Sequence, residues 1–387
     1  MPVKQKKILH IISSLDSFGI GSELTALTGR LPDALFSNEI CNLADTGLRC
    51  LFRTVPHAAF HAGVLLNVVR KIRCFRPDIV HAWDSTAHFY GGLAALLCRT
   101  PSLTAEKRNF SRPAGIVQRF IDTKTKTLIA LRQREELPES KTVIVPPAAV
   151  PMKHYDPVPA AELLGKIGFP LIPPSGNYYP LLNSQYEPER RNYRFIPPDD
   201  PGRQQPFLIG IISPLCTEHR IHDALWIFVT LKTLNLNFHV LIIGDGQDQE
   251  TLLRCRDRWK LFSRVHFIGA RKDVDRLLPC FDALLHLSPV PEQIGSVSAA
   301  MSCGIPVVAE ETPEISGMIT DGVTGMLIPG SEDFRFRRRT AVKKILHLFE
   351  NAELRRSIKS AAKKHAADQF CFDTAVQKRT EIFAACR

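Results

Sequence analysis

FDALLHLSPVPEQIGSVSAAMSCGIPVVAEE, residues 281–311 of the chain, predicts a strand, a loop, a helix and a second strand in succession. Residues 283–287 form an apolar run of the length expected of a buried parallel strand. Pro289 ends that strand, because a proline donates no hydrogen bond to a ladder. Residues 292–303 are rich in small side chains and predict a helix that a glycine closes. The next buried strand follows at residues 307–309.

In such a unit the loop after the first strand lies at the carboxyl edge of the sheet, and the N-terminus of the helix points to the same edge. The unpaired N–H groups and the positive end of the helix dipole favour an anionic ligand there, most often a phosphate. An ordinary strand–helix–strand crossover without a ligand has the same pattern, and from the geometry alone it is the more common case.

The composition is that of a globular protein with an excess of positive charge. The 387 residues predict two or three domains, and 44% hydrophobic with 23% charged residues is ordinary for this class. The formal net charge of +11 fits a nucleotide diphosphate, an anionic membrane face or a nucleic acid as partner. Aromatic residues do not alternate with the basic ones, so we expect no nucleic-acid partner.

The ten cysteines are scattered, and none forms a Cys-x-x-Cys pair or a cluster with histidine. We interpret them as buried thiols of a reducing compartment, not as disulfides or zinc ligands. The apolar run near the N-terminus is too short for a secretory signal, and no stretch is long enough to span a bilayer. We therefore expect a cytoplasmic protein, or one peripheral to the inner face of the membrane.

Two alternations of strands and helices divide the chain into α/β domains. We expect the first over residues 1–150 and the second over residues 207–369, each with a parallel sheet covered by helices on both faces. Residues 151–206 are rich in Pro, Tyr, Asn, Asp and Arg, which predicts a linker with an irregular insertion. A terminal helix over residues 370–387 is expected to pack back on the first domain.

Four segments of the second half follow the order found in group-1 glycosyltransferases. They are LIIGDG at 241–246, VHFIG at 265–269, GIPVV at 304–308 and DGVTG at 321–325. The chain resembles this family over residues 207–330, and the resemblance is looser in the first half. It implies the GT-B arrangement, in which two Rossmann-like domains face each other across a cleft.

The resemblance also implies a function. Its members are retaining enzymes that move a sugar from a nucleotide-sugar donor, held mainly by the second domain, to an acceptor on the first. A saccharide or a lipid-linked acceptor, in the synthesis of a cell-surface polysaccharide or glycoconjugate, would fit. The charge of the leaving diphosphate can be stabilised by arginine, backbone N–H groups and a helix end. Because no Asp-x-Asp triplet of the metal-binding kind stands at a strand end, we expect no metal and no other cofactor.

Two other functions are compatible with the same fold. One is a degenerate relative that binds a nucleotide sugar or scaffolds an assembly without catalysis. The other is an epimerase of the same architecture, which the order of the motifs disfavours.

Family members carry two glutamates in the segment quoted first, and Glu292 matches the first of them. The resemblance makes Glu292 the catalytic candidate, in contact with the sugar. The alternative is an acid that stabilises the dipole of its own helix. Alanine, Ala299 or Ala300 depending on the alignment, stands where the second glutamate would hold the ribose hydroxyls.

In the family, the loop after the first strand of the second domain carries an arginine and a lysine that bind the diphosphate. Pro214 stands in place of the arginine, and His219 or Arg220 in place of the lysine. Arg220 offers a fork of N–H donors to a phosphate, whereas His219 would bind a phosphate only when it is protonated.

Residues at other strand ends, glycine turns and helix starts complete the candidate donor site. Glycine lets the backbone approach a ligand closely, and an arginine after a strand end can reach the nucleotide. These candidates are Gly19, Gly21, Gly244, Arg271, Gln293, Gly295 and Ser296. A simple tight turn is the alternative for the first two glycines, and helix capping is the alternative for Ser296.

On the acceptor side we expect His81 and Asp84, which lie near the end of a predicted strand at the ligand edge of the first sheet. A buried core histidine is the alternative for His81. A basic helix start at residues 334–344 could meet an anionic bilayer that carries a lipid-linked acceptor. A solvated charged face is the more frequent explanation for such a run.

Overall fold

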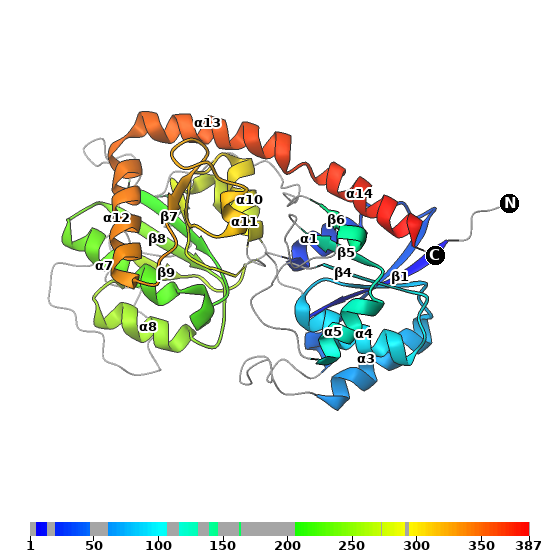
Figure 1. The fold of residues 1–387 in the computed structure, drawn as a ribbon. Helices are drawn as coiled ribbons and strands as arrows, with labels where there is room; N and C mark the ends of the chain where they lie inside the picture. Colours follow the sequence, from blue (N-terminus) through cyan, green and yellow to red (C-terminus); the bar gives the residue numbers. More distant parts are fainter. Residues whose placement is uncertain are drawn as a thin grey trace. The chain divides into compact units, whose positions relative to one another are not determined.

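The computed structural model describes residues 5–13, 20–46, 61–106, 116–130, 139–145, 162–163, 206–271, 273–290 and 294–386. The chain divides into two compact units (Figure 1). Unit 1 comprises Met1–Pro151, Val290–Ser298 and Ala367–Arg387, and unit 2 comprises Met152–Pro289 and Ala299–Ala366. Most of the predicted linker at 151–206 lies outside the described residues.

Unit 1 is built on a six-stranded parallel sheet, sheet A, with strand order β2-β1-β3-β4-β5-β6. Its strands are β1 (Lys6–Ile12), β2 (Phe36–Asn42), β3 (Ile79–Ala82), β4 (Ser102–Glu106), β5 (Thr127–Ala130) and β6 (Thr142–Ile144). The helices described in this unit are α1 (Ile20–Thr28), α3 (Ala62–Phe75), α4 (Ser85–Leu97), α5 (Ile116–Lys124) and α14 (Phe372–Ala385).

Helices cover both faces of sheet A, because side chains of a strand alternate between the two faces. Leu9 and Ile11 of β1 belong to a core that includes residues of α3, α4 and α5. Ile8 and Ile12 belong to the opposite core, which contains residues of α1 and of α14. The last helix of the chain is thus part of the core of the first unit.

A buried arginine anchors α14 on unit 1. Arg379 is 1% exposed, and its Nη2 lies 2.8 Å from Glu23 Oε1 and 3.0 Å from Glu106 Oε1. Its guanidinium also lies 5.4 Å from the centre of the Trp83 ring. Removing one partner of such a buried ion pair costs about 3–5 kcal/mol, since the other charge is left uncompensated.

Unit 2 is built on a second six-stranded parallel sheet, sheet B, with strand order β12-β11-β10-β7-β8-β9. Its strands are β7 (Phe207–Ile212), β8 (Phe238–Ile243), β9 (Val265–Phe267), β10 (Ala283–His286), β11 (Val307–Glu310) and β12 (Met326–Ile328). The helices after β7 are α7 (Ile221–Thr233), α8 (Gln249–Arg258), α9 (Val274–Leu277), α10 (Ile294–Cys303), α11 (Pro313–Ser316), α12 (Phe334–Glu350) and α13 (Ala352–Gln369).

The two sheets confirm the predicted α/β class. The quoted segment forms β10, α10 and β11, and the carboxyl half of its loop lies outside the described residues. The strand order of sheet B reverses between β7 and β10, which is where ligands bind in open parallel sheets. Within the described ranges, none of the helices has the length and apolar character needed to cross a bilayer.

The basic helix α12 begins at Phe334, where the basic stretch expected at residues 334–344 begins. The reason is a side-chain cap: the carboxylate of Asp333 accepts a 2.8 Å hydrogen bond from the backbone N–H of Arg335.

Five buried histidines should make the protein sensitive to mild acid. Burial lowers the pKa of His10 to about 3 and those of His219, His239 and His286 to about 4, and it lowers the pKa of His266 well below 6.5. Below its ordinary value of 6.5, each ring binds a proton in the unfolded chain but not in the folded one. The stabilisation that comes from keeping these rings neutral is therefore fully present above pH 6.5. It is lost as the pH falls from there toward the pKa values of the folded state.

We expect the free energy of unfolding to fall by up to about 1.4 kcal/mol per pH unit for each of these rings. Urea denaturation across the range from about pH 7 to pH 5 measures this slope. The variant His10→Gln should lose one such contribution and give a shallower slope. Identical slopes for the variant and the parent chain would contradict the assignment for His10.

Candidate functional site

The loops after β7 and β8 are held together by their backbones at the carboxyl edge of sheet B. Leu215 N–H donates to Asp245 O at 2.8 Å, and Asp248 N–H donates to Leu215 O at 2.9 Å. The Thr217 hydroxyl adds a 2.7 Å hydrogen bond to the Asp248 carboxylate. These contacts make the two loops a single rigid rim next to the switch point.

Glycine is required where these loops meet. Gly244 has φ +145, and a Cβ at this position would lie 2.0 Å from Ser213 O. A Cβ on Gly246 would lie 2.3 Å from Leu215 O. The Gly-Asp-Gly sequence therefore serves the close approach of two backbones. Whether Gly244 also contacts a donor stays a prediction.

His219, one of the two candidates for the position of the family's lysine, is buried, and its contact with a phosphate stays a prediction. It ends the 3-10 turn Thr217–His219 and is 5% exposed. Its Nδ1 lies 2.7 Å from the hydroxyl of Ser288, which follows β10. Burial lowers the pKa of His219 to about 4, so the ring carries no charge near neutral pH. His219 thus links the loop after β7 to the loop after β10.

Arg220 follows directly and is held by an acid from a distant strand. It adopts φ 56 at the N-cap of α7, in the left-handed region. One terminal nitrogen of its guanidinium, Nη1, donates to the carboxylate of Glu310, the last residue of β11. The side chain of Arg220 remains 29% exposed, whereas that of Glu310 is 7% exposed.

The pair belongs to a larger network of three arginines and two carboxylates. Arg337 Nε lies 3.8 Å from Glu310 Oε1, and Arg337 Nη2 lies 3.3 Å from Asp223 Oδ2. Arg338 Nη2 donates to Asp223 at 2.6 Å. One positive charge is left over, and Arg220 is the most exposed member.

Sequence reasoning missed Glu310. The signal was present, because a charged residue that ends the apolar strand VVAE must be paired or exposed.

Arg271 is also paired within the chain. Its Nε and Nη2 donate to the two carboxylate oxygens of Asp273 at 2.8 and 2.7 Å. This hydrogen-bonded pair raises the pKa of Arg271 and lowers that of Asp273. Arg271 follows β9 at the same edge of sheet B as Arg220, but its guanidinium is directed at its own neighbour.

The loop and first turn before α10 are described only in part. Glu292 and Gln293 lie outside the described residues, as does Gly19. Gly295 and Ser296 are in the first turn of α10, and Ser296 is 3% exposed. The predictions for these residues stay predictions.

The candidates of unit 1 occupy structural positions. Gly21 lies in the first turn of α1, where its carbonyl accepts a hydrogen bond from Thr25 at 2.9 Å. His81 is fully buried, with Nδ1 2.7 Å from Thr104 Oγ1, which is the core-histidine alternative. Asp84 caps α4: it accepts from Ala87 N–H at 2.8 Å and also from the backbone and hydroxyl of Ser13.

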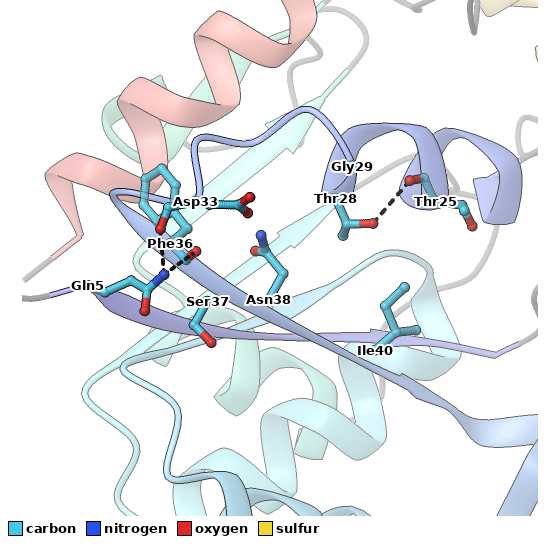
Figure 2. A pocket seen from close by; sticks show the side chains of 9 residues that line it. All are labelled: Gln5, Thr25, Thr28, Gly29, Asp33, Phe36, Ser37, Asn38 and Ile40. Atoms are coloured by element: carbon cyan, nitrogen blue, oxygen red, sulfur yellow. Dashed lines mark hydrogen bonds between the residues drawn. The ribbon is translucent and has the colours of Figure 1, made fainter.

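A surface pocket of about 500 Å³ lies in unit 1 between α1 and β2 (Figure 2). Thr25, Thr28 and Gly29 at the end of α1 line it together with Ser37, Asn38 and Ile40 of the strand, and the Asn38 side chain points toward Thr28. The pocket contains none of the predicted site residues, and Asp33 is its one charged lining residue. Within the described ranges, no three His, Cys, Asp or Glu side chains are grouped so that they could hold a metal ion.

The comparisons with known proteins agree with this architecture. Residues 195–365 match the family model described as glycosyl transferases group 1. A 165-residue segment is 27% identical to the N-acetyl-alpha-D-glucosaminyl L-malate synthase of Bacillus anthracis, and the match spans 42% of each chain.

Solved structures resemble this chain over nearly its whole length, but at low sequence identity. A similarity of this kind shows the fold and nothing more. Anabaena HepE in complex with UDP and glucose has a TM-score of 0.69 at 19% identity, over 98% of this chain and 100% of that one. WaaG, a glycosyltransferase involved in lipopolysaccharide biosynthesis, has a TM-score of 0.66 at 14% identity, with the same coverage. The chain therefore has the GT-B fold, and its residues 195–365 form a group 1 glycosyltransferase domain.

Proposed function

We propose that the protein is a retaining glycosyltransferase that moves a sugar from a nucleotide-sugar donor to a saccharide or lipid-linked acceptor. The observation that carries the proposal is the group 1 domain at residues 195–365, whose loops converge at the switch point of sheet B. Among the structural neighbours, HepE was solved with UDP and glucose, and WaaG is involved in lipopolysaccharide biosynthesis. Synthesis of a cell-surface polysaccharide or glycoconjugate is the setting that we propose for this chain.

In this proposal the N-terminus of α10 and the Arg220 guanidinium stabilise the negative charge that develops on the leaving diphosphate. Glu292, with Gln293 before the helix, contacts the donor sugar, and Ser296 donates its hydroxyl to a phosphate oxygen. Gly19 and Gly21 allow backbone to approach the diphosphate, and Arg271 reaches the nucleotide once it separates from Asp273. Asp84 and His81 are buried and support the surface on the acceptor side from below.

A nucleotide-sugar-binding or scaffold protein without catalysis is the second candidate. Specific observations favour it: alanine occupies the position of the second glutamate, and His219 is neutral. Arg220 and Arg271 are both paired with carboxylates of the chain itself. Fewer charged groups would then contact the donor than the transfer of its sugar requires.

Donor-dependent thermal stabilisation separates these candidates. A ligand at a hundred times its dissociation constant stabilises a protein by about 2.7 kcal/mol, so a panel of UDP-, GDP-, ADP- and dTDP-sugars should reveal the donor. Hydrolysis of that donor is then compared between the parent chain, Glu292→Ala and the exposed-acid control Glu332→Ala. We expect donor hydrolysis to be lost in Glu292→Ala and to be unchanged in Glu332→Ala.

Stabilisation without turnover would support the binding protein. Equal turnover in Glu292→Ala and the parent chain would remove Glu292 from the site, and the absence of stabilisation by any donor would contradict the proposed function.

Glu310 should compete with the donor for Arg220. In Glu310→Gln the amide oxygen can still accept from Arg220, but the opposing charge is gone, so we expect tighter binding of a nucleoside diphosphate by about fivefold, or about 1 kcal/mol. Arg220→Met should weaken binding by about tenfold or more, since a charge-assisted hydrogen bond is lost. Isothermal titration calorimetry measures both effects.

The control is Glu311→Gln, which makes the same charge change at the neighbouring exposed residue. Weaker binding in Glu310→Gln would mean that Glu310 positions Arg220 for the ligand and does not compete with it.

Metal removal should leave the reaction intact, because cationic side chains and a helix end are proposed to stabilise the diphosphate. We expect transfer, or donor hydrolysis, to persist after dialysis against EDTA. A loss of activity that Mg²⁺ or Mn²⁺ restores would show that these groups are insufficient without a metal.

We place the reaction in the cytoplasm, at the inner face of the membrane where a lipid-linked acceptor would be found. The net charge of +11 supports this placement.

A further inference from the structure

Two neighbouring helices of unit 2, α7 and α12, carry exposed aromatic side chains, and the half-buried Trp259 follows the adjacent helix α8. Helix α7 contacts both α8 and α12, and the three labels lie together in Figure 1. Phe334 and Phe336, in the first turn of α12, are 44% and 45% exposed, and Trp226 of α7 is 37% exposed. Large apolar side chains so close together on a surface are unusual and mark a place of contact.

We call these exposed side chains, together with Trp259, the aromatic patch: Trp226, Trp259, Phe334 and Phe336. The rings of Trp226 and Trp259 are 4.6 Å apart. The guanidinium of Arg338 lies 5.3 Å from the Trp226 ring and 4.5 Å from the Phe334 ring, so it joins α7 to α12. Its charge is compensated by Asp223 at 2.6 Å.

Uncompensated positive charge borders the patch. Arg335, Arg339 and Lys343 are exposed on α12, and no ion pair holds any of the three within the described part of the chain. Two acids also lie there, Glu332 and Asp333, and Asp333 is engaged in capping the helix. Over residues 332–343, the three exposed cations outnumber these two acids by one.

The position of Arg335 is unfavourable for the helix itself. The N-terminus of a helix carries the positive end of its dipole, so a basic residue in the first turn destabilises the helix. Arg335 is in that turn of the 17-residue helix α12 and has no carboxylate partner among the described residues. An anionic surface outside the chain would remove this electrostatic cost.

We propose that the aromatic patch and its bordering cations dock unit 2 on an anionic phospholipid surface. Tryptophan and phenylalanine rings insert at the boundary between headgroups and acyl chains, and arginines pair with the phosphates. An anionic bilayer matches both the aromatic side chains and the cations of this surface. A protein partner would have to supply an acidic rim that is complementary to the cations. The inference rests on the proposed function only in that a lipid-linked acceptor would lie in the same membrane.

Tryptophan fluorescence tests the proposal, because the chain has three tryptophans and Trp83 is fully buried. The full chain is mixed with phosphatidylcholine vesicles, with or without phosphatidylglycerol, and followed by sedimentation and emission spectra. We expect binding only to the vesicles that contain phosphatidylglycerol, with a blue shift of the emission. The shift should be smaller in Trp226→Phe, which still binds, because Trp259 is then the one tryptophan left in the patch.

Two double variants identify the surface. Arg335→Gln with Arg339→Gln should weaken vesicle binding by about tenfold or more, since each basic residue near an anionic surface contributes about fivefold. Phe334→Ser with Phe336→Ser should abolish the blue shift. The control is Arg356→Gln with Lys364→Gln on the exposed face of α13, which should bind as the parent chain does.

Equal vesicle binding by the surface variants and the control, or no binding to phosphatidylglycerol, overturns the proposal. Self-association that the patch variants abolish, with no vesicle binding, overturns it in favour of a protein interface. Thermal stabilisation by a donor is measured on the same samples. Its absence in a chain that still binds vesicles counts against the proposed function alone.

Discussion

The burial of sheet B constrains everything that unit 2 can do. Every residue of its strands is buried except the half-buried Phe267, because helices cover a parallel sheet on both faces. Polar chemistry is therefore confined to the strand ends and loops. At the carboxyl edge, backbone contacts hold the loops after β7 and β8 so closely that only glycine fits at Gly244, and this rigid rim carries the candidate site.

Most of the charge at this rim is compensated within the chain, and one positive charge is left over in the network around Arg220. Arg220 is opposed by Glu310 and Arg271 by Asp273, and the buried ring of His219 is neutral. A site built to hold a diphosphate with free cations would leave such groups uncompensated. The chain instead keeps its guanidinium groups satisfied without a ligand, which lowers the cost of burying them and lowers the attraction for an anion. The N-terminus of α10 becomes correspondingly more important for any phosphate.

The two units use charged residues in opposite ways. In unit 1, Arg379 is buried between Glu23 and Glu106 and secures the last helix to the core. In unit 2, the arginines at the start of α12 stay at the surface beside exposed aromatic rings. Burial makes the first arginine a structural element, whereas exposure leaves the second group able to bind a partner. Basic residues thus stabilise the fold in unit 1, whereas those at the start of α12 in unit 2 are proposed to bind a surface.

The sequence by itself determined the order of strands and helices, the switch-point segment and the family motifs, because these depend on local periodicity and on glycine and proline. Only the tertiary structure decided which candidates can act. Arg220 follows β7 and Glu310 ends β11, and β10 lies between these two strands, so their pairing depends on the strand order. The neutrality of His219 follows from burial beside Ser288, a contact across 69 residues of sequence. Pairing and burial arise from the packing of distant segments, and a local pattern does not contain them.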